Sequence, residues 1–169
     1  MRLATSICAL ALTAMTVSAH AVSDKGFVEK AARGGLAEVQ LGQLAQQKAT
    51  NPEVKAMAQH IVQGHQKANQ ELQQMAQAKG IVIPTNLDRK HEKTQEKLSK
   101  LSGAEFDKEY VKAMVKDHKD DIEDFEKQAK RGEDPELKNW AAQIMPVLQE
   151  HLKMAQALEE QLKNQGKNR

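Results

Sequence analysis

The chain has 169 residues, a formal net charge of +2 and only 3% aromatic residues. This length favours one compact domain, and the abundance of Ala, Gln, Glu, Lys and Leu favours helices over a β-sheet. So small a charge gives no support for a nucleic-acid partner or for attraction to a membrane surface.

The N-terminal segment has the pattern of a secretory signal peptide. Arg2 supplies the positive charge, residues 3–17 form an apolar run too short to span a bilayer, and residues 19–21 form a small-x-small cleavage site. We predict a cleaved signal peptide at 1–21 and a periplasmic protein; the alternative is an internal first helix. The only cysteine, Cys8, leaves with the signal peptide, so the mature chain has no disulfide or thiol ligand. No later run suits a transmembrane segment.

Two long helical patterns follow, joined by a sharp corner. The first covers residues 24–49, and its narrow face consists mostly of small residues that allow another helix to approach closely. Asn51 is a good N-cap, and Pro52 fits the first position of the second helix. That helix is predicted to run to Lys79, where Gly80 provides a left-handed stop.

A short, highly charged helix is predicted at 87–101, on the surface, between the first and second pairs of long helices. Ser102 and Glu105 then match a capping box, which predicts the start of a third long helix that ends at Gly132.

The last long helix is predicted to begin at Pro135, in a corner that resembles the first one. Pro146 lies inside its pattern and predicts a kink. We assign residues 22–163 to the helical domain and residues 164–169 to a polar tail.

The two corners indicate an internal duplication. Adding 83 to a residue number places Pro52 on Pro135 and Glu38 on Asp121. The chain therefore reads as an all-α four-helix bundle built from two αα-hairpins. About 20 residues join the hairpins, including the short extra helix, which is long enough to cross the length of a bundle.

Each long helix carries one polar residue within its apolar face. The four residues are Glu38, His65, His118 and His151. They lie between 13 and 17 residues from the corners at Asn51 and Asp134, which at 1.5 Å per residue is roughly 20–25 Å. We therefore expect all four side chains to meet in a central layer, with Asp121 as an additional candidate one turn beyond His118.

Such a layer has two interpretations, because a buried imidazole or carboxylate without a partner costs a few kcal/mol. In the first, the four residues bind a metal ion, with zinc, copper and iron all left open. In the second, they bond to each other, to Tyr110 and to trapped water, and so fix the register of the bundle.

Di-iron chemistry is disfavoured, because the Glu-x-x-His motif of ferritin-like enzymes is absent. Val62, Val115 and Leu148 stand three residues before the three histidines. His60 and His91 fall outside the apolar faces and are expected to be solvated. The methionines are expected to fill gaps in the core rather than to bind copper.

Four strings carry a resemblance to a known family: FVEKAARGGLAEVQLGQLA, NPEVKAMAQHIVQGHQKANQEL, FDKEYVKAMVKDH and PVLQEHLKMAQAL. They resemble the bacterial exported family called domain of unknown function 4142. The resemblance implies a ferritin-like four-helix fold and a periplasmic or outer-membrane-associated protein without an established activity. The family pattern falls on the residues Glu38, His65, Phe106, Tyr110, His118 and His151. One departure is Gln63-Gly64, where an acidic residue is common; we expect Gly64 to weaken its helix without touching a ligand.

The leading functional hypothesis is a non-catalytic binding or stress-associated protein of the bacterial envelope, with an envelope protein as its partner. The alternative is a metal-binding protein or metalloenzyme that uses the central Glu/His layer. The sequence shows no phosphate-binding loop and no nucleophile beside a base. It does not indicate a ligand or an oligomeric state.

Overall fold

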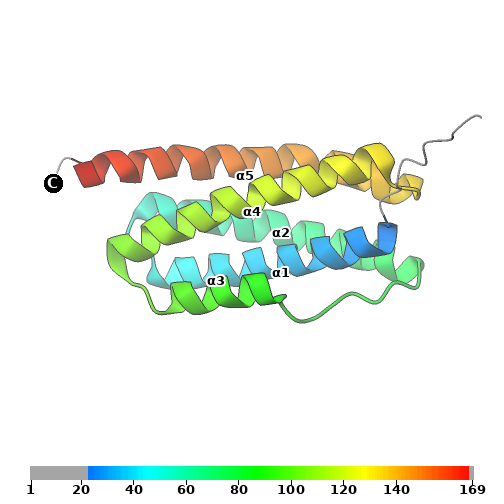
Figure 1. Cartoon of the computed structure of the whole chain (residues 1–169), viewed down its shortest axis with the longest axis horizontal. Helices are drawn as coiled ribbons and strands as arrows, with labels where there is room; N and C mark the ends of the chain where they lie inside the picture. Colours follow the sequence, from blue (N-terminus) through cyan, green and yellow to red (C-terminus); the bar gives the residue numbers. More distant parts are fainter. Residues whose placement is uncertain (1–22, 168–169) are drawn as a thin grey trace, which may run out of the picture.

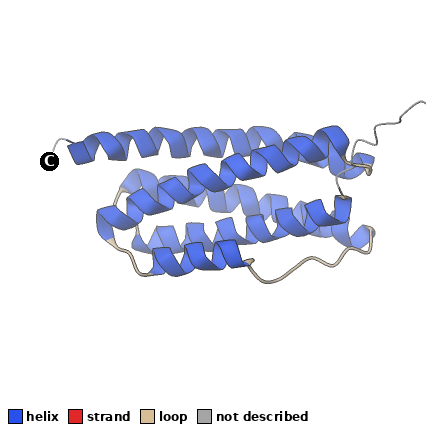
Figure 2. Cartoon of the chain, in the orientation of Figure 1, coloured by secondary structure: helices blue, strands red, loops and turns tan. Residues whose placement is uncertain are grey.

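The computed structural model describes residues 23–167, and the predicted signal peptide at 1–21 lies outside the described residues. This part of the chain forms five helices (Figures 1 and 2). They are α1 (Asp24–Lys48), α2 (Pro52–Ala78), α3 (Arg89–Ser99), α4 (Gly103–Arg131) and α5 (Pro135–Lys167).

The four long helices form two antiparallel hairpins, α1–α2 and α4–α5. The hairpins pack together through contacts of α1 with α4 and of α2 with α5. The segment between α2 and α4 returns along the length of the bundle, so α2 and α4 run in the same direction (Figure 1). The predicted all-α bundle of two hairpins, with a long crossover that contains an extra helix, is therefore confirmed.

The crossover helix α3 contacts both α1 and α4. Its buried side carries Leu98 and His91, which are 1% and 8% exposed. The expectation that His91 is solvated was therefore wrong. Because α3 lies against two long helices, one side of it is enclosed even though the segment has few apolar residues. His91 Nδ1 lies 2.9 Å from a carboxylate oxygen of Asp88 at the start of the same helix.

The predicted helix ends are largely confirmed. Asn51 caps α2 by accepting a hydrogen bond from the backbone N–H of Glu53, and Gly80 has a φ of +66° at the stop after α2. The capping box at Ser102 is not formed, because the Ser102 side chain makes no capping hydrogen bond. Gly103, with a φ of +61°, turns the chain at this point. At the other end of the chain, α5 continues to Lys167 and so includes part of the predicted tail.

Two aspartates brace the corners of the bundle in a reciprocal way. Asp107, near the start of α4, accepts hydrogen bonds from the backbone N–H groups of Thr50 (3.0 Å) and Asn51 (2.9 Å). Asp24, at the start of α1, accepts from the backbone N–H groups of Glu133 (3.2 Å) and Asp134 (2.7 Å). The two aspartates differ by the repeat offset of 83, and so do the residues that they bind: Thr50 with Glu133, and Asn51 with Asp134. Each hairpin therefore stabilises the corner of the other.

The apolar core consists of two clusters at opposite ends of the bundle. One surrounds the α1–α2 corner and includes Leu41, Ile61, Phe106 and Tyr110. The other lies near the α4–α5 corner and includes Phe27, Leu72, Phe125, Leu137 and Trp140. On each long helix, the polar residue predicted for the central layer falls between the residues of these two clusters.

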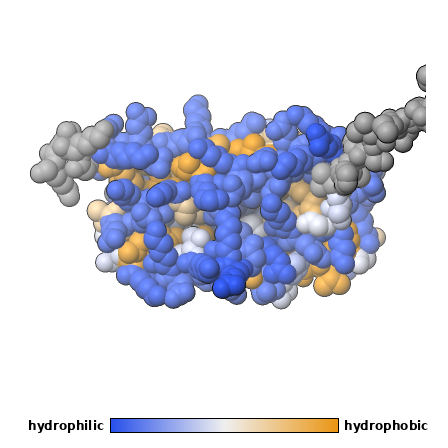
Figure 3. Space-filling model, viewed as in Figure 1, coloured by the Kyte–Doolittle hydropathy of each residue, from blue (hydrophilic) through white to orange (hydrophobic). Residues whose placement is uncertain are grey.

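The outside of the bundle is polar on the face that Figure 3 shows, where hydrophobic residues form only small patches between hydrophilic ones. Among the described residues, Val82 in the crossover is an exposed large apolar side chain, at 81%. None of the described helices has the length and apolar character needed to cross a membrane.

Candidate metal centre

The four polar residues predicted to meet in the middle of the bundle do so. Glu38, His118 and His151 are fully buried, and His65 is 6% exposed. Each comes from a different long helix, and each is held in place by the apolar clusters on either side of it along that helix. The layer is therefore a polar plane inside an otherwise apolar core.

Glu38 connects two of the imidazoles. Its Oε2 atom lies 2.8 Å from His65 Nε2, and its Oε1 atom lies 3.1 Å from His118 Nδ1. Neither oxygen has a well-aligned hydrogen bond despite these short distances. The carboxylate therefore faces the two rings mainly as a charge, and it keeps lone pairs for another partner.

The histidine tautomers follow from the hydrogen bonds. His118 Nδ1 lies 3.0 Å from the backbone carbonyl oxygen of Met114, which can only accept, so Nδ1 carries the proton. When the His118 ring is neutral, its Nε2 atom has a lone pair, which accepts from His151 Nδ1–H at 3.1 Å. This leaves a lone pair on His151 Nε2, a buried atom without a hydrogen-bond partner.

The protonation states of Glu38 and His151 are set by burial and by neighbouring charge. Burial alone would raise the pKa of Glu38, but positive charge on His118 and His65 outweighs it and lowers this pKa to about 2. Burial, reinforced by like charge on His65 and His118, lowers the pKa of His151 to about 3. At neutral pH the layer therefore contains an ionised Glu38 carboxylate and a neutral His151, which offers a lone pair.

Tyr110 does not join the hydrogen bonds of the layer, although it was considered as a partner. Its hydroxyl is fully buried and has no hydrogen-bond partner among the described residues. Burial, and then the negative charge of Glu38, raise the pKa of Tyr110 above its usual value. Tyr110 therefore belongs to the apolar cluster beside the layer, with an unsatisfied hydroxyl.

The three imidazoles form a compact group. A nitrogen from each of His65, His118 and His151 lies within 4.8 Å of the others. The ring centroids are 5.2–5.6 Å apart. Asp121 lies outside this group and faces Gly34, where an added Cβ would be 3.6 Å from its Oδ1 atom. It lines a separate cavity of about 330 Å³ together with charged residues that include Lys90 and Asp124.

Two residues that the sequence analysis set aside contact this centre. A Cβ atom on Gly64 would lie 2.8 Å from Cε1 and 3.0 Å from Nε2 of His151, so the expectation that Gly64 touches no ligand was wrong. The ring of His60 lies edge-on to that of His151, with centroids 5.3 Å apart. His60 and Gly64 are four residues apart, so they lie on the same face of α2. This spacing is the one signal in the sequence that relates the two residues to each other.

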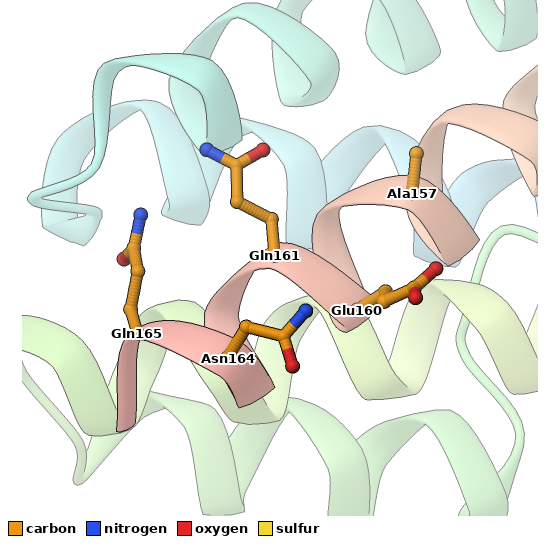
Figure 4. Close-up of a pocket in the computed structure, with 5 residues that line it drawn as sticks. All are labelled: Ala157, Glu160, Gln161, Asn164 and Gln165. Carbon is orange, nitrogen blue, oxygen red and sulfur yellow. The ribbon is translucent and has the colours of Figure 1, made fainter. Parts of the chain in front are cut away.

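Another cavity, of about 470 Å³, lies along the C-terminal part of α5 (Figure 4). It is lined by Ala157, Glu160, Gln161, Asn164 and Gln165. These side chains are amides, one carboxylate and one methyl group, and they lie beyond the α5 residues of the central layer. This cavity offers no imidazole and does not add to the centre.

Comparison with known proteins gives a family and a fold. No curated protein matches the sequence. A DUF305 fragment from Deinococcus radiodurans has a similar structure, with a TM-score of 0.73 and 14% identity over 81% of this chain and 95% of that one. CopM is similar in its Cu(II)-bound form (TM-score 0.71, 18% identity, 83% of this chain and 98% of that one). The Ag-bound form of CopM is also similar, with a TM-score of 0.69 and 19% identity over 83% of this chain and 97% of that one. The family model described as a domain of unknown function (DUF4142) matches residues 9–158. The chain therefore belongs to the DUF4142 family.

Proposed function

We propose that this protein is an exported, non-catalytic metal-binding protein of the periplasm. It holds one transition-metal ion between His65, His118 and His151, and Glu38 balances the charge of the ion. The observation that carries the proposal is the convergence of three imidazole nitrogens within 4.8 Å of one another in the buried middle of the bundle.

The spacing of one pair of nitrogens, from His118 and His151, suits a metal ion. In tetrahedral coordination with metal–nitrogen bonds of 2.0–2.1 Å, two ligand atoms lie about 3.3 Å apart. His118 Nε2 and His151 Nδ1 are 3.1 Å apart. A metal ion between them would replace the proton that they now share. The carbonyl of Met114 already holds the opposite side of the His118 ring, which is a common support for a metal-binding imidazole.

The donor set favours a divalent ion of intermediate softness. Imidazoles suit zinc, copper and iron, and a single carboxylate offsets part of the charge of such an ion. The mature chain has no cysteine, so a thiolate site for a softer ion is excluded. CopM, which shares the fold, has been solved with Cu(II) and with Ag bound. We therefore put Cu²⁺ first and Zn²⁺ second.

The alternative is a purely structural layer in an envelope or stress-associated protein. The hydrogen bond between His118 and His151 and the short distances from Glu38 to His65 and His118 support it. Against it, His151 Nε2 and the oxygens of Glu38 are buried and lack aligned hydrogen bonds. A network selected only for stability is expected to satisfy its buried polar atoms, so we favour the metal.

The test is metal analysis of protein purified from the periplasm without a histidine tag, followed by calorimetric titration with Cu²⁺ and Zn²⁺. We expect one ion per chain. Replacing His65 and His118 together by Gln should abolish binding, since it removes two of the three imidazoles. His91→Gln is the matched control, because it removes a buried histidine from α3 and should retain the ion. Metal-free protein whose melting temperature does not respond to either ion would refute the proposal.

The proposed location has its own test. The mass of the purified mature chain should correspond to a protein that starts at Val22. A chain that keeps its first 21 residues in the periplasmic fraction would contradict the predicted cleavage.

A further inference from the structure

A second polar region lies apart from the central layer. It is the cavity of about 330 Å³ between α1, α3 and α4, and apart from Gly34 its lining residues are all charged or titratable. Three lysines and one histidine line it together with five carboxyl groups, those of Asp88, Asp120, Asp121, Glu123 and Asp124. When all five carboxyl groups are ionised and the histidine is neutral, the lining has an excess of two negative charges, which attracts a cation.

Four of the five carboxyl groups already have a basic partner. The pairs are Lys30–Asp124, Lys90–Asp120, His91–Asp88 and Lys127–Glu123. Each lysine that lines the cavity is therefore bound to a carboxylate, so the lining has no spare ammonium group for an anionic ligand. Asp121 is the fifth carboxyl group, and it forms neither an ion pair nor a hydrogen bond with any residue between 23 and 167.

Asp121 is thus a carboxyl group without a counter-charge. Gly34 faces it from α1, where an added Cβ atom would lie 3.6 Å from Oδ1 and 3.9 Å from Oδ2, so α1 places no side chain over these oxygens. Burial, and then the negative charges of Glu38 and Asp117, raise the pKa of Asp121 well above its usual value. A positively charged ligand would remove this electrostatic cost.

A buried imidazole in the cavity wall also lacks a satisfied hydrogen bond. His91 is 8% exposed and belongs to the lining. Its Nδ1 atom has no aligned hydrogen bond, although a carboxylate oxygen of Asp88 lies 2.9 Å away. Buried polar atoms in native proteins are almost always hydrogen-bonded, so this atom indicates a partner that enters the cavity from outside the chain.

The arrangement of the carboxyl groups determines the kind of cation. In the part of the chain that the structure describes, the side chains that converge closely enough to hold a metal ion are His65, His118 and His151 of the central layer. The carboxyl groups of the cavity are too dispersed to share one small ion. The lining also has no Phe, Tyr or Trp ring, which a quaternary ammonium ion would need. A cation with two separate groups that donate hydrogen bonds fits this lining best.

We propose that the cavity between α1, α3 and α4 binds a small alkyl diammonium ion. One ammonium group donates hydrogen bonds to the Asp121 carboxylate, and the other binds beside Asp88 and His91. Such charge-assisted hydrogen bonds are stronger than neutral ones, and they satisfy the groups that the chain leaves unpaired. This site lies outside the central layer and needs no bound metal, so it goes beyond the proposed function.

The test is calorimetric titration of the full, metal-free mature chain with putrescine, the diammonium ion of butane. We expect one putrescine per chain. Asp121→Asn should weaken binding by about tenfold or more, because it removes hydrogen bonds to a charged group. Butylamine, which has a single ammonium group, should also bind more weakly than putrescine to the wild type.

Thermal unfolding gives a second measurement. Putrescine should raise the melting temperature of the wild type, since a ligand that binds only the folded state stabilises it. It should leave the melting temperature of Asp121→Asn unchanged. Glu105→Gln is the matched control, because it removes an exposed carboxylate from the same helix at a position outside the cavity. This control should bind putrescine as the wild type does.

Three results would overturn the site. They are no binding of putrescine to the wild type, equal binding to the wild type and Asp121→Asn, and displacement of putrescine by an equal concentration of Mg²⁺. The last result would show that the cavity holds an inorganic ion. None of them would affect the proposed metal centre, which is tested by metal analysis, and a metal-free central layer would leave the diammonium site intact.

Discussion

Glu38 and Asp121 occupy equivalent positions in the two halves of the chain, yet their surroundings give them opposite electrostatic properties. Glu38 is fully buried, and positive charge on the neighbouring imidazoles lowers its pKa to about 2 despite burial. Asp121 is partly exposed, and burial together with the negative charge of Glu38 and Asp117 raises its pKa well above its usual value. For Glu38 the neighbouring imidazoles outweigh burial, whereas for Asp121 burial and the neighbouring carboxylates act in the same direction.

The difference comes from what each half places beside the carboxyl group. The counterparts of His118 and His151 under the offset of 83 are Gly35 and Ala68 in the first half. The offset therefore pairs two carboxyl positions, and the three histidines of the layer surround only that of Glu38. This asymmetry makes the region of Glu38 a candidate metal centre and leaves Asp121 in a charged cavity lined by residues of α1, α3 and α4.

The largest expected effect is from Glu38→Gln in the metal-free protein. Removal of this charge should lower the free energy of unfolding by about 3 kcal/mol, as for one partner of a buried ion pair. A carboxyl group whose folded pKa is lowered stabilises the protein above its unfolded pKa. The difference between wild type and variant should thus be complete above pH 4.5 and disappear as the pH falls to about 2. Urea unfolding measured across this range tests it, and a difference that does not change with pH would contradict it.

The two corner braces allow a second comparison between the halves. Asp107 is 2% exposed and also accepts from the hydroxyl of Thr50 at 2.7 Å, whereas Asp24 is partly exposed. Asp107→Ala should cost about 2 kcal/mol, since it removes the hydrogen bonds that a buried, charged carboxylate accepts from Thr50 and Asn51 at the α1–α2 corner. Asp24→Ala should cost about 1 kcal/mol, similar to the loss of a helix cap. Denaturant unfolding of both variants measures the two losses in free energy of unfolding. Equal losses would contradict the prediction that Asp107→Ala costs more than Asp24→Ala.

Gly64 lies against His151 of the centre, and the side chain of its counterpart Val147 lies beside Gly64, 3.5 Å from where a Cβ atom on Gly64 would be. Gly64→Ala should lower stability by about 1 kcal/mol, since crowding of the His151 ring exceeds the gain in helix propensity. The NMR signals of His151 should shift as well. Gln63→Ala, at an exposed neighbouring position, is the control and should change neither. A more stable Gly64→Ala variant would show that the ring has room to move.

The smallest expected effect is a gain in stability from Asp121→Asn. A carboxyl group whose folded pKa is raised favours the folded state while it is protonated, and it destabilises the protein as the pH rises through that pKa. The Asn variant should therefore melt at a higher temperature than the wild type at pH 7 and at a similar temperature at pH 3. Thermal unfolding at the two pH values provides the measurement. A lower melting temperature at pH 7 would show that ionised Asp121 stabilises the fold.

Much of the architecture was accessible from the sequence, because helix spacing and corner residues are local signals. Asn51 and Pro52 marked one corner, and Asp134 and Pro135 marked the other. The distances from these corners were enough to place Glu38 and the three histidines in one layer. Such distances are sufficient because the rise of a helix is constant and the hairpins are regular.

The errors concern residues whose environment depends on a distant segment. His91 is buried because α3 packs against α1 and α4. The charged sequence of α3 contains no apolar pattern that predicts this contact. The role of Gly64 depends on a ring from α5, and the contact of His60 depends on the same ring. Such information is absent from helix periodicity, because periodicity describes one helix and not its neighbours.

The reciprocal braces bear on the ancestry of the fold. Asp24 binds the corner of the second hairpin, and Asp107 binds the corner of the first. A single hairpin cannot make this contact with itself, because its first residue and its corner lie at opposite ends of the same helix. Before duplication, the same contacts would have required a second identical chain arranged about a twofold axis. In this interpretation the long crossover joins the two halves of such a pair, and each half could then acquire different side chains at its centre.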